Sequence, residues 1–204
     1  MSTPQKSSDS RDAIVESPPL SEEILEDLRA HKPAAVQRFV ELYLPRIYHL
    51  AYRMCRQLDL ARDAAQEALT IALQKVHQFR GESRLITWLY QILFRECLRS
   101  RRESTRWATM VSLDERPDLA ALSKFTLSPG PEEQSLRDEE RRLFWEAVER
   151  LPESLRSVYL LREVEGLSTQ EVARVLGLSE SNVKVRLHRA RQRLKNFLAK
   201  AVRP

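Results

Sequence analysis

The stretch from Gly166 to Lys195 reads GLSTQEVARVLGLSESNVKVRLHRARQRLK and carries two helix-start signals on either side of a glycine. Ser168 and Glu171 match a Ser-x-x-Glu capping box, in which each side chain satisfies a free backbone donor of the other residue. Gly177 suits the left-handed conformation that ends many helices, and Ser179 can cap a second helix. The stretch therefore predicts a short helix, a sharp turn and a longer helix.

The predicted second helix has an apolar face and a basic face. Its apolar residues are spaced by four and three positions, as one face of an α-helix requires: Val183, Leu187, Ala190 and Leu194. Six cations lie between residues 180 and 195, against Glu180 as the one acid: Lys184, Arg186, Arg189, Arg191, Arg193 and Lys195. Such a unit is typical of a helix-turn-helix whose second helix enters the DNA major groove. The alternative is a helical hairpin with a solvated basic face, and the coincidence of the caps, the glycine and the cations favours DNA binding.

The whole composition indicates a nearly all-helical chain. It has 204 residues, a formal net charge of +5 and only four glycines, which is enough for two small helical domains. No apolar run approaches the roughly 20 residues that a membrane helix needs, so we expect no membrane insertion. Residues 1–20 lack a hydrophobic signal core and are expected to form a disordered tail, which favours a cytoplasmic location.

The chain gives little support for an enzyme or a metal site. Cys55 and Cys97 are isolated in the sequence, with no C-x-x-C pattern and no histidine at ligand spacing. We expect them to be buried free thiols, and we expect neither a disulfide framework, nor a metal ion, nor a cofactor. No set of nucleophile, base and orienting group is visible, so the sequence favours a non-catalytic protein.

An acidic segment separates two helical modules. Residues 112–140 hold eight acids and three bases, and the SPGP motif at 128–131 interrupts any helix there. We expect a flexible acidic linker at 104–138, between a domain at 21–103 and a domain at 139–204. The linker is either a solvated tether or a segment that competes with DNA for the basic surfaces.

The N-terminal module shows three long helical patterns after a short helix near Ile24. Pro45 lies inside the first long pattern and predicts a kink or a break there. The three patterns cover residues 34–56, 60–77 and 86–102. The middle one has an alanine-rich apolar face and an opposite face with Asp63, Gln66 and Glu67.

Two blocks of sequence carry a resemblance to a known family. DAAQEALTIALQKVHQFRGESRLITWLYQI, residues 63–92, resembles the second conserved domain of bacterial sigma factors of the extracytoplasmic-function (ECF) group. RLPESLRSVYLLREVEGLSTQEVARVLGLSESNVKVRLHRARQRLK, residues 150–195, resembles their fourth domain. With their flanking helices the two blocks cover most of residues 22–200, and their order is highly specific. The resemblance implies a dissociable specificity subunit that brings core RNA polymerase to promoters and helps to melt them.

The resemblance also implies roles for the N-terminal module. Asp63, Gln66 and Glu67 would dock on the clamp helices of the polymerase β′ subunit. A second set would bind the non-template strand of the minus-ten element and a flipped base: Lys75, Phe79, Arg80, Ser83, Arg84, Thr87 and Trp88. For Phe79 and Trp88, core packing is an equally good interpretation. Arg95 stands near a position where the family often has asparagine, which leaves the minus-ten preference open.

In the C-terminal module, the resemblance implies readers of the minus-thirty-five element. Lys184, Val185 and His188 would face base edges, and Ser181 shares their exposed surface. Arg186, Arg189 and Arg191 would face phosphates. For His188, a phosphate contact is an equally good interpretation. The family also implies that this domain grips the polymerase β flap, and that an anti-sigma factor holds the protein inactive.

Two rival functions remain from the sequence. One is a helix-turn-helix repressor or activator that binds duplex sites without polymerase. The other is a DNA recombinase or nuclease with a helix-turn-helix tail. The second rival needs a catalytic serine or a third carboxylate beside Asp63 and Glu67, and the sequence shows neither at a suitable spacing.

Overall fold

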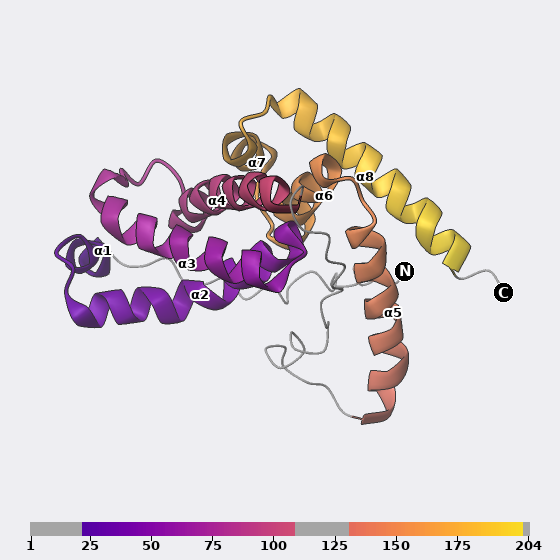
Figure 1. The fold of residues 1–204 in the computed structure, drawn as a ribbon, viewed down its shortest axis with the longest axis horizontal. Coiled ribbons are helices and arrows are strands. Elements are labelled where there is room, and N and C mark those ends of the chain that lie inside the picture. Colours follow the sequence, from indigo (N-terminus) through magenta and orange to yellow (C-terminus); the bar gives the residue numbers. More distant parts are fainter. Residues whose placement is uncertain (1–21, 109–130, 202–204) are drawn as a thin grey trace, which may run out of the picture.

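The computed structural model describes residues 22–108 and 131–201, and every regular element in these two ranges is a helix (Figure 1). The predicted all-α class is therefore confirmed. The expected tail at 1–20 and the greater part of the expected linker lie outside the described residues. Within those ranges, no helix combines the length and the apolar character that a membrane crossing demands.

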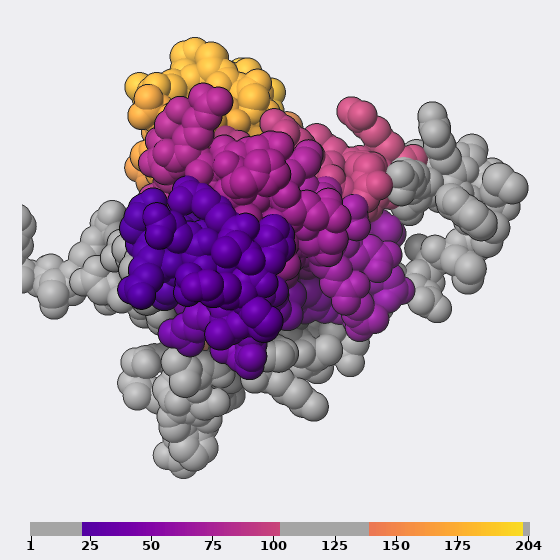
Figure 2. All heavy atoms as spheres, turned by 90° about the vertical axis from the view of Figure 1, so that its left-hand side faces the viewer, coloured from indigo at the N-terminus to yellow at the C-terminus, as the bar shows by residue number. Residues whose placement is uncertain are grey.

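The N-terminal lobe is a small helical bundle. Its elements are α1 (Glu22–Arg29), α2 (Pro33–Cys55), α3 (Leu58–Lys75), the 3₁₀ turn η1 (Val76–Gln78) and α4 (Leu85–Ala108). Helix α3 packs against both α2 and α4. Figure 2 views this lobe from the α1 end, with α1 and α2 in indigo at the front and the C-terminal helix in yellow at the top.

Small side chains allow α3 to approach its two neighbours closely. The inward face of α3 is made of residues that are at most 1% exposed: Ala61, Ala64, Ala65, Ala68 and Ala72. An alanine pays no side-chain entropy in a helix and leaves room for the large residues of the facing helices. Leu50 of α2 and Leu93 of α4 are among these fully buried neighbours. The predicted alanine face is confirmed.

Pro45 does not divide the helix that contains it. Helix α2 runs through Pro45 as one element of 23 residues, so the break that the sequence allowed for is absent. Tyr43 and Ile47, on either side, are 3% and 0% exposed, and this burial holds both halves of the helix on one core. Pro45 itself is exposed, where its ring meets no packed neighbour. The helix ends at Cys55, and Arg56 follows in the left-handed conformation with φ 63°.

The C-terminal lobe contains five elements. They are α5 (Pro131–Glu149), α6 (Glu153–Tyr159), the π-helical turn η3 (Leu160–Val164), α7 (Thr169–Leu176) and α8 (Glu180–Ala201). Their core includes Val148, Leu160, Leu167, Val172 and Val183, each at most 1% exposed. Helix α4 continues to residue 108 and α5 begins at residue 131, so both ends of the expected linker at 104–138 are helical. The domain boundaries themselves stay a prediction.

A buried arginine joins the two lobes. Arg156 of α6 is 4% exposed and donates through Nη2 to the Met54 carbonyl in the last turn of α2, at 3.2 Å. Its Nη1 donates to the carbonyls of Glu149 and Leu151, where α5 ends. Helix C-termini carry partial negative charge, so one guanidinium satisfies carbonyls from two helix ends. The two lobes therefore form one packed structure.

We expect Ala68→Leu to destabilise the chain by about 1–3 kcal/mol, because three extra carbon atoms have no room between α3 and its neighbours. Ala68 is 1% exposed. Gln74→Leu, at an exposed site of the same helix, is the matched control and should change the free energy of unfolding by less than about 0.5 kcal/mol. Urea unfolding followed by circular dichroism measures both, and equal midpoints would contradict the packing described for α3.

Candidate nucleic-acid interface

The helix-turn-helix unit forms with the caps that the sequence predicts. The Ser168 side chain accepts from the Glu171 amide, and the Glu171 carboxylate accepts from the Ser168 amide at 2.8 Å, which completes the capping box. Gly177 ends α7 in the left-handed conformation with φ 65°. Ser179 then accepts from the Asn182 amide at 3.3 Å and starts α8. The local sequence therefore fixes both helix ends of this unit.

Helix α8 separates its apolar and polar faces as expected. Val183, Leu187, Ala190 and Leu194 are buried. Four of the predicted base-contacting residues are exposed in the first half of the helix: Ser181, Lys184, Val185 and His188. Val185 is 48% exposed, which is unusual for a large apolar side chain and leaves its methyl groups free for a contact.

The cations of α8 differ in their contacts. Lys184 and Arg189 are exposed. Arg186 is half-buried and donates to Asn182 Oδ1 at 2.8 Å. Arg191 pairs with Glu163 at the end of η3, at 2.6 Å. Arg191 therefore lies on the polar face of α8 and also forms an ion pair within its own lobe.

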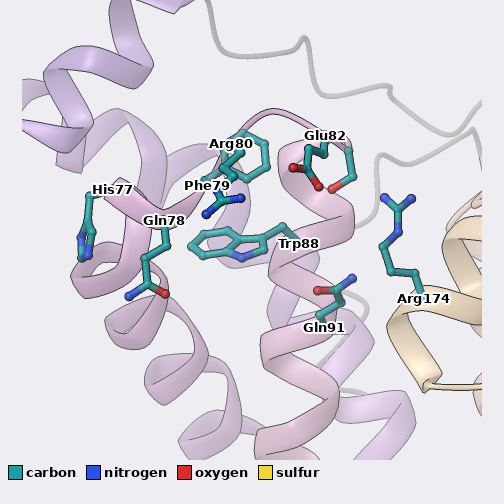
Figure 3. A pocket seen from close by; sticks show the side chains of 9 residues that line it. His77, Gln78, Phe79, Arg80, Glu82, Trp88, Gln91 and Arg174 are labelled. Atoms are coloured by element: carbon teal, nitrogen blue, oxygen red, sulfur yellow. The ribbon is translucent and has the colours of Figure 1, made fainter.

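The loop between η1 and α4 forms a cavity with the start of α4. The cavity measures about 730 Å³, within the range of small-ligand sites. Figure 3 shows the Phe79 and Trp88 rings side by side in it, and their centroids lie 5.6 Å apart. Its other lining residues come from both lobes: His77, Gln78, Arg80, Glu82, Ser83, Gln91 and Arg174. Arg174 belongs to α7, so the helix-turn-helix unit borders the cavity.

Burial divides the residues predicted for the minus-ten element. Phe79 is 7% exposed and Trp88 is half-buried, so each side chain both packs against the lobe and lines the cavity. Thr87 is fully buried. Lys75, Arg80, Arg84 and Arg95 are exposed, and Ser83 is half-buried. Arg95 follows Trp88 by seven positions and Gln91 by four, so all three lie on one face of α4.

Glu171 connects the two lobes at the edge of this cavity. Its carboxylate accepts two hydrogen bonds from Arg84, at 2.9 and 3.1 Å, and one from the Thr87 hydroxyl at 2.8 Å. Burial alone would raise the pKa of Glu171. The hydrogen bonds from Arg84, Ser168 and Thr87 outweigh that effect and lower the pKa to about 2. One carboxylate therefore caps α7 and binds two residues predicted to contact DNA.

Glu165 forms a second connection between the two lobes. It follows the π-helical turn and accepts from Arg46 Nε at 3.0 Å and from the Tyr90 hydroxyl. The side chains of Arg46 and Glu165 are only 19% and 10% exposed. Burial and the neighbouring carboxylate raise the pKa of Tyr90, so the phenol keeps the proton that it donates. This cluster fastens α2 and α4 to the C-terminal lobe.

The sequence alone did not identify these inter-lobe contacts. Glu171 was assigned only its capping role, and Glu165, Arg46 and Tyr90 were assigned no role. Their partners lie 75 to 119 positions away, except for the capping contacts. Gln91 could have been assigned to the cavity from the sequence, because it follows Trp88 by one helical turn.

The predicted polymerase-binding residues form a separate exposed face. Asp63, Gln66 and Glu67 are all exposed on α3. Glu67 forms an ion pair with Arg99 of α4 at 3.8 Å, and its side chain is still 46% exposed. None of the hydrogen bonds between the lobes described above involves this face.

Two family profiles match this chain. The profile described as sigma-70 region 2 matches residues 39–107, and the profile described as sigma-70 region 4 matches residues 141–194. The first match contains the α3 face and every cavity-lining residue except Arg174, and the second contains Arg174 and the helix-turn-helix unit.

Curated relatives show the same similarity. The chain is 37% identical over 152 residues to a "Probable RNA polymerase sigma factor RfaY" of Xanthomonas campestris pv. campestris, although the match spans only 36% of that protein. It is 30% identical to the RNA polymerase sigma-H factor of Pseudomonas aeruginosa, over 89% of this chain and 95% of that one. It is also 30% identical to the ECF RNA polymerase sigma-E factor of Escherichia coli, over 69% of this chain and 75% of that one.

A solved structure shares the fold. The match is to the sigma factor RpoE in complex with the anti-sigma factor NepR from Bartonella quintana, with a TM-score of 0.58 and 25% identity. It covers 82% of this chain and 98% of that one.

We expect the Glu171 contacts to depend on pH. Because the pKa of about 2 lies below the ordinary value of 4.5, the stabilisation is complete above about pH 4.5 and is lost as the pH falls towards 2. Glu171→Gln keeps a capping side chain but removes the charge. It should lower the free energy of unfolding by about 1 kcal/mol at pH 7, since Arg84 is half exposed to solvent.

Thermal melting of both chains from pH 7 to pH 3 measures this difference. We expect the two melting temperatures to converge as the pH falls below about 4.5. A constant difference across the whole range would show that the carboxylate charge does not hold the lobes together.

Proposed function

The chain belongs to the ECF group of RNA polymerase sigma factors, and from this premise we propose how its two lobes divide promoter recognition. It is an alternative sigma factor that binds core RNA polymerase, recognises promoter DNA and promotes initiation of transcription. The observation that carries the residue assignments is the presence of two different DNA-suited surfaces, an aromatic cavity on one lobe and a basic helix on the other.

In this proposal, α8 reads the minus-thirty-five element as duplex DNA. A Lys side chain can donate to guanine O6 and N7 in the major groove, and an exposed valine can contact a thymine methyl group. Lys184 and Val185 are exposed next to each other in the first half of α8, where a recognition helix enters the groove. Arg189 then contacts phosphate, and Arg186 supports the helix through Asn182.

The cavity beside Trp88 binds the minus-ten element as a single strand. Extruding a base costs a few kcal/mol, which stacking and hydrogen bonds in a pocket recover. Phe79 and Trp88 supply aromatic surface, Gln91 supplies an amide that can pair with a base edge, and Arg80 supplies a charge for the backbone. Ser83 also lines the cavity, and we assign the exposed Lys75 and Arg95 to the same strand. Arg95 places a longer cation near a position where the family often has asparagine, which leaves the base preference there open.

Other surfaces hold the chain on the enzyme. We assign Asp63, Gln66 and Glu67 of α3 to the clamp helices of β′, and the C-terminal lobe to the β flap. The protein supplies specificity and no catalytic group, and it acts in the cytoplasm, where the polymerase and the chromosome are. The sigma factor RpoE of Bartonella quintana binds an anti-sigma factor, and we propose a protein of that kind as a partner here.

In the structure the two lobes are in contact through Glu171, an arrangement that we call closed. The closed arrangement is incompatible with binding both elements at once. The centres of a minus-ten and a minus-thirty-five element are 25 base pairs apart by their names, which is about 85 Å of B-DNA at 3.4 Å per pair. In the closed chain, Arg84 and Thr87 of one lobe lie within hydrogen-bond distance of Glu171 of the other. We therefore propose that the lobes separate when the chain binds polymerase and promoter.

The closed form covers the two DNA surfaces unequally. Helix α7 lies against α4 beside the cavity, whereas α8 extends away from the N-terminal lobe (Figure 1). Single-strand binding therefore requires the inter-lobe contacts to break, while the reading face of α8 stays accessible.

Runoff transcription tests the function. Purified core polymerase with this chain should initiate at a small set of promoters, which start-site mapping after overexpression identifies. A chain that binds the same duplex sites and directs no runoff product with core polymerase would instead be a repressor or activator.

We expect Lys184→Ala to weaken binding to a cognate minus-thirty-five duplex by about 1–3 kcal/mol and to leave binding to scrambled DNA nearly unchanged. Arg189→Ala is the comparison, and it should weaken both, because a phosphate contact carries no sequence information. Fluorescence anisotropy at fixed salt measures the four affinities. Equal losses on cognate and scrambled DNA for Lys184→Ala would contradict its assignment as a base reader.

We expect Glu171→Gln to bind a single-stranded minus-ten oligonucleotide about fivefold more tightly than the wild-type chain, because less free energy is spent on opening the lobes. Glu41→Gln removes the same charge from an exposed site on α2 and should leave the affinity unchanged. Tighter binding by both variants would indicate a general charge effect, and unchanged binding by both would show that the contact does not limit access.

A further inference from the structure

The two cysteines of the chain lie next to each other in the folded N-terminal lobe. Cys55 is the last residue of α2 and Cys97 lies in α4, and their sulfur atoms are 3.1 Å apart. They are 6% and 5% exposed. The expectation of buried thiols is confirmed, and the 42 positions between them in the sequence concealed their proximity. No part of the proposed promoter-binding function uses either one.

Cys55 borders a cleft at the junction of the two lobes. The cleft measures about 520 Å³, and its lining includes Cys55, Arg101 and residues 149–153 of the C-terminal lobe. Arg56 and Arg156 also line the cleft, and Arg156 donates to the carbonyl of Met54, the neighbour of Cys55. Cys55 therefore lines a space that a small molecule can enter, and Cys97 is not among the residues that line it.

The surroundings give the two thiols different chemistry. A hydrogen bond from Cys97 lowers the pKa of Cys55, and the charges of Arg101 and Arg156 act in the same direction, against burial and the charge of Glu153. The same hydrogen bond and burial raise the pKa of Cys97. A thiolate beside cations is the reactive form of cysteine, so Cys55 is the nucleophile of the pair and Cys97 the second thiol.

We propose that Cys55 and Cys97 are a redox modification site, which a hydroperoxide converts to a reversible disulfide. The Cys55 thiolate attacks the outer oxygen of the hydroperoxide, the O–O bond breaks, and the leaving alkoxide or hydroxide takes a proton. Cys55 becomes a sulfenic acid. The Cys97 sulfur then attacks the Cys55 sulfur, its proton leaves with the hydroxyl group as water, and the S–S bond forms.

The geometry needs only a small movement. A disulfide has sulfur atoms about 2.05 Å apart, so the two side chains must approach by roughly 1 Å from the 3.1 Å that separates them. The bond would tie the end of α2 to α4 beside the Arg101–Glu153 ion pair that crosses between the lobes. A thiol reductant reverses the reaction by thiol–disulfide exchange.

The test uses the full wild-type chain treated with hydrogen peroxide. We expect its two titratable thiols to fall to zero and its intact mass to fall by about 2 Da, the mass of the two hydrogen atoms removed. The product should be monomeric on a non-reducing gel, and dithiothreitol should restore both thiols. A chain that keeps two thiols in the native state under peroxide, or that forms only disulfide-linked dimers, would overturn the proposal.

Two single variants test the assigned order of reaction. With Cys97→Ala, dimedone should trap a sulfenic acid at Cys55, because no second thiol is left to remove it. With Cys55→Ala, the same treatment should label Cys97 at least tenfold more slowly, since Cys97 is not among the residues that line the cleft. Equal labelling of the two variants would overturn the assignment of Cys55 as nucleophile. If a variant does not fold, dimedone added to the wild-type chain during oxidation, with peptide mapping of the adduct, gives the same comparison.

Discussion

The carboxylate of Glu171 is the contact on which the arrangement of the molecule depends. It completes the capping box at the start of α7, and it also holds Arg84 and Thr87 at the start of α4. The group that orders the helix-turn-helix unit thus occupies residues that the family resemblance assigns to single-stranded DNA. Glu165 with Arg46 and Tyr90, and Arg156 at the ends of α2 and α5, extend this contact along the junction.

The strength of the Glu171 contact suits a reversible closure. The Arg84–Glu171 ion pair is partly exposed and contributes up to about 1 kcal/mol, which is small beside the stability of the cores. A ligand shifts such an equilibrium by its difference in affinity for the open and closed forms. Polymerase and promoter together bind surfaces on both lobes, and promoter spacing requires those surfaces to lie far apart. Under the proposed function, closure therefore weakens single-strand binding by the free chain, whereas the predicted reading face of α8 stays exposed.

Local patterns in the sequence predicted the local structure well. The caps at Ser168 and Gly177 and the apolar faces of α3 and α8 appear as expected, because short-range hydrogen bonds and helical periodicity determine them. Contacts between distant positions were not predictable from one sequence. Glu171 shows its capping partner three positions away, but nothing near it points to Arg84, which lies 87 positions away. Cys55 and Cys97 likewise became a pair only when α2 and α4 packed together. At Pro45, the burial of Tyr43 and Ile47 outweighed the tendency of proline to interrupt a helix.

The distance between the lobes reports whether they separate when the chain binds polymerase and promoter. Dyes placed through unnatural amino acids at Gln57, next to the cleft residue Arg56, and at Pro152, which lines the same cleft from the C-terminal lobe, report this distance by single-molecule energy transfer, and both positions are exposed. If the lobes separate, the free chain gives one high-transfer population and the complex with core polymerase and promoter DNA gives a low-transfer population. The same transfer efficiency in both states would contradict that separation.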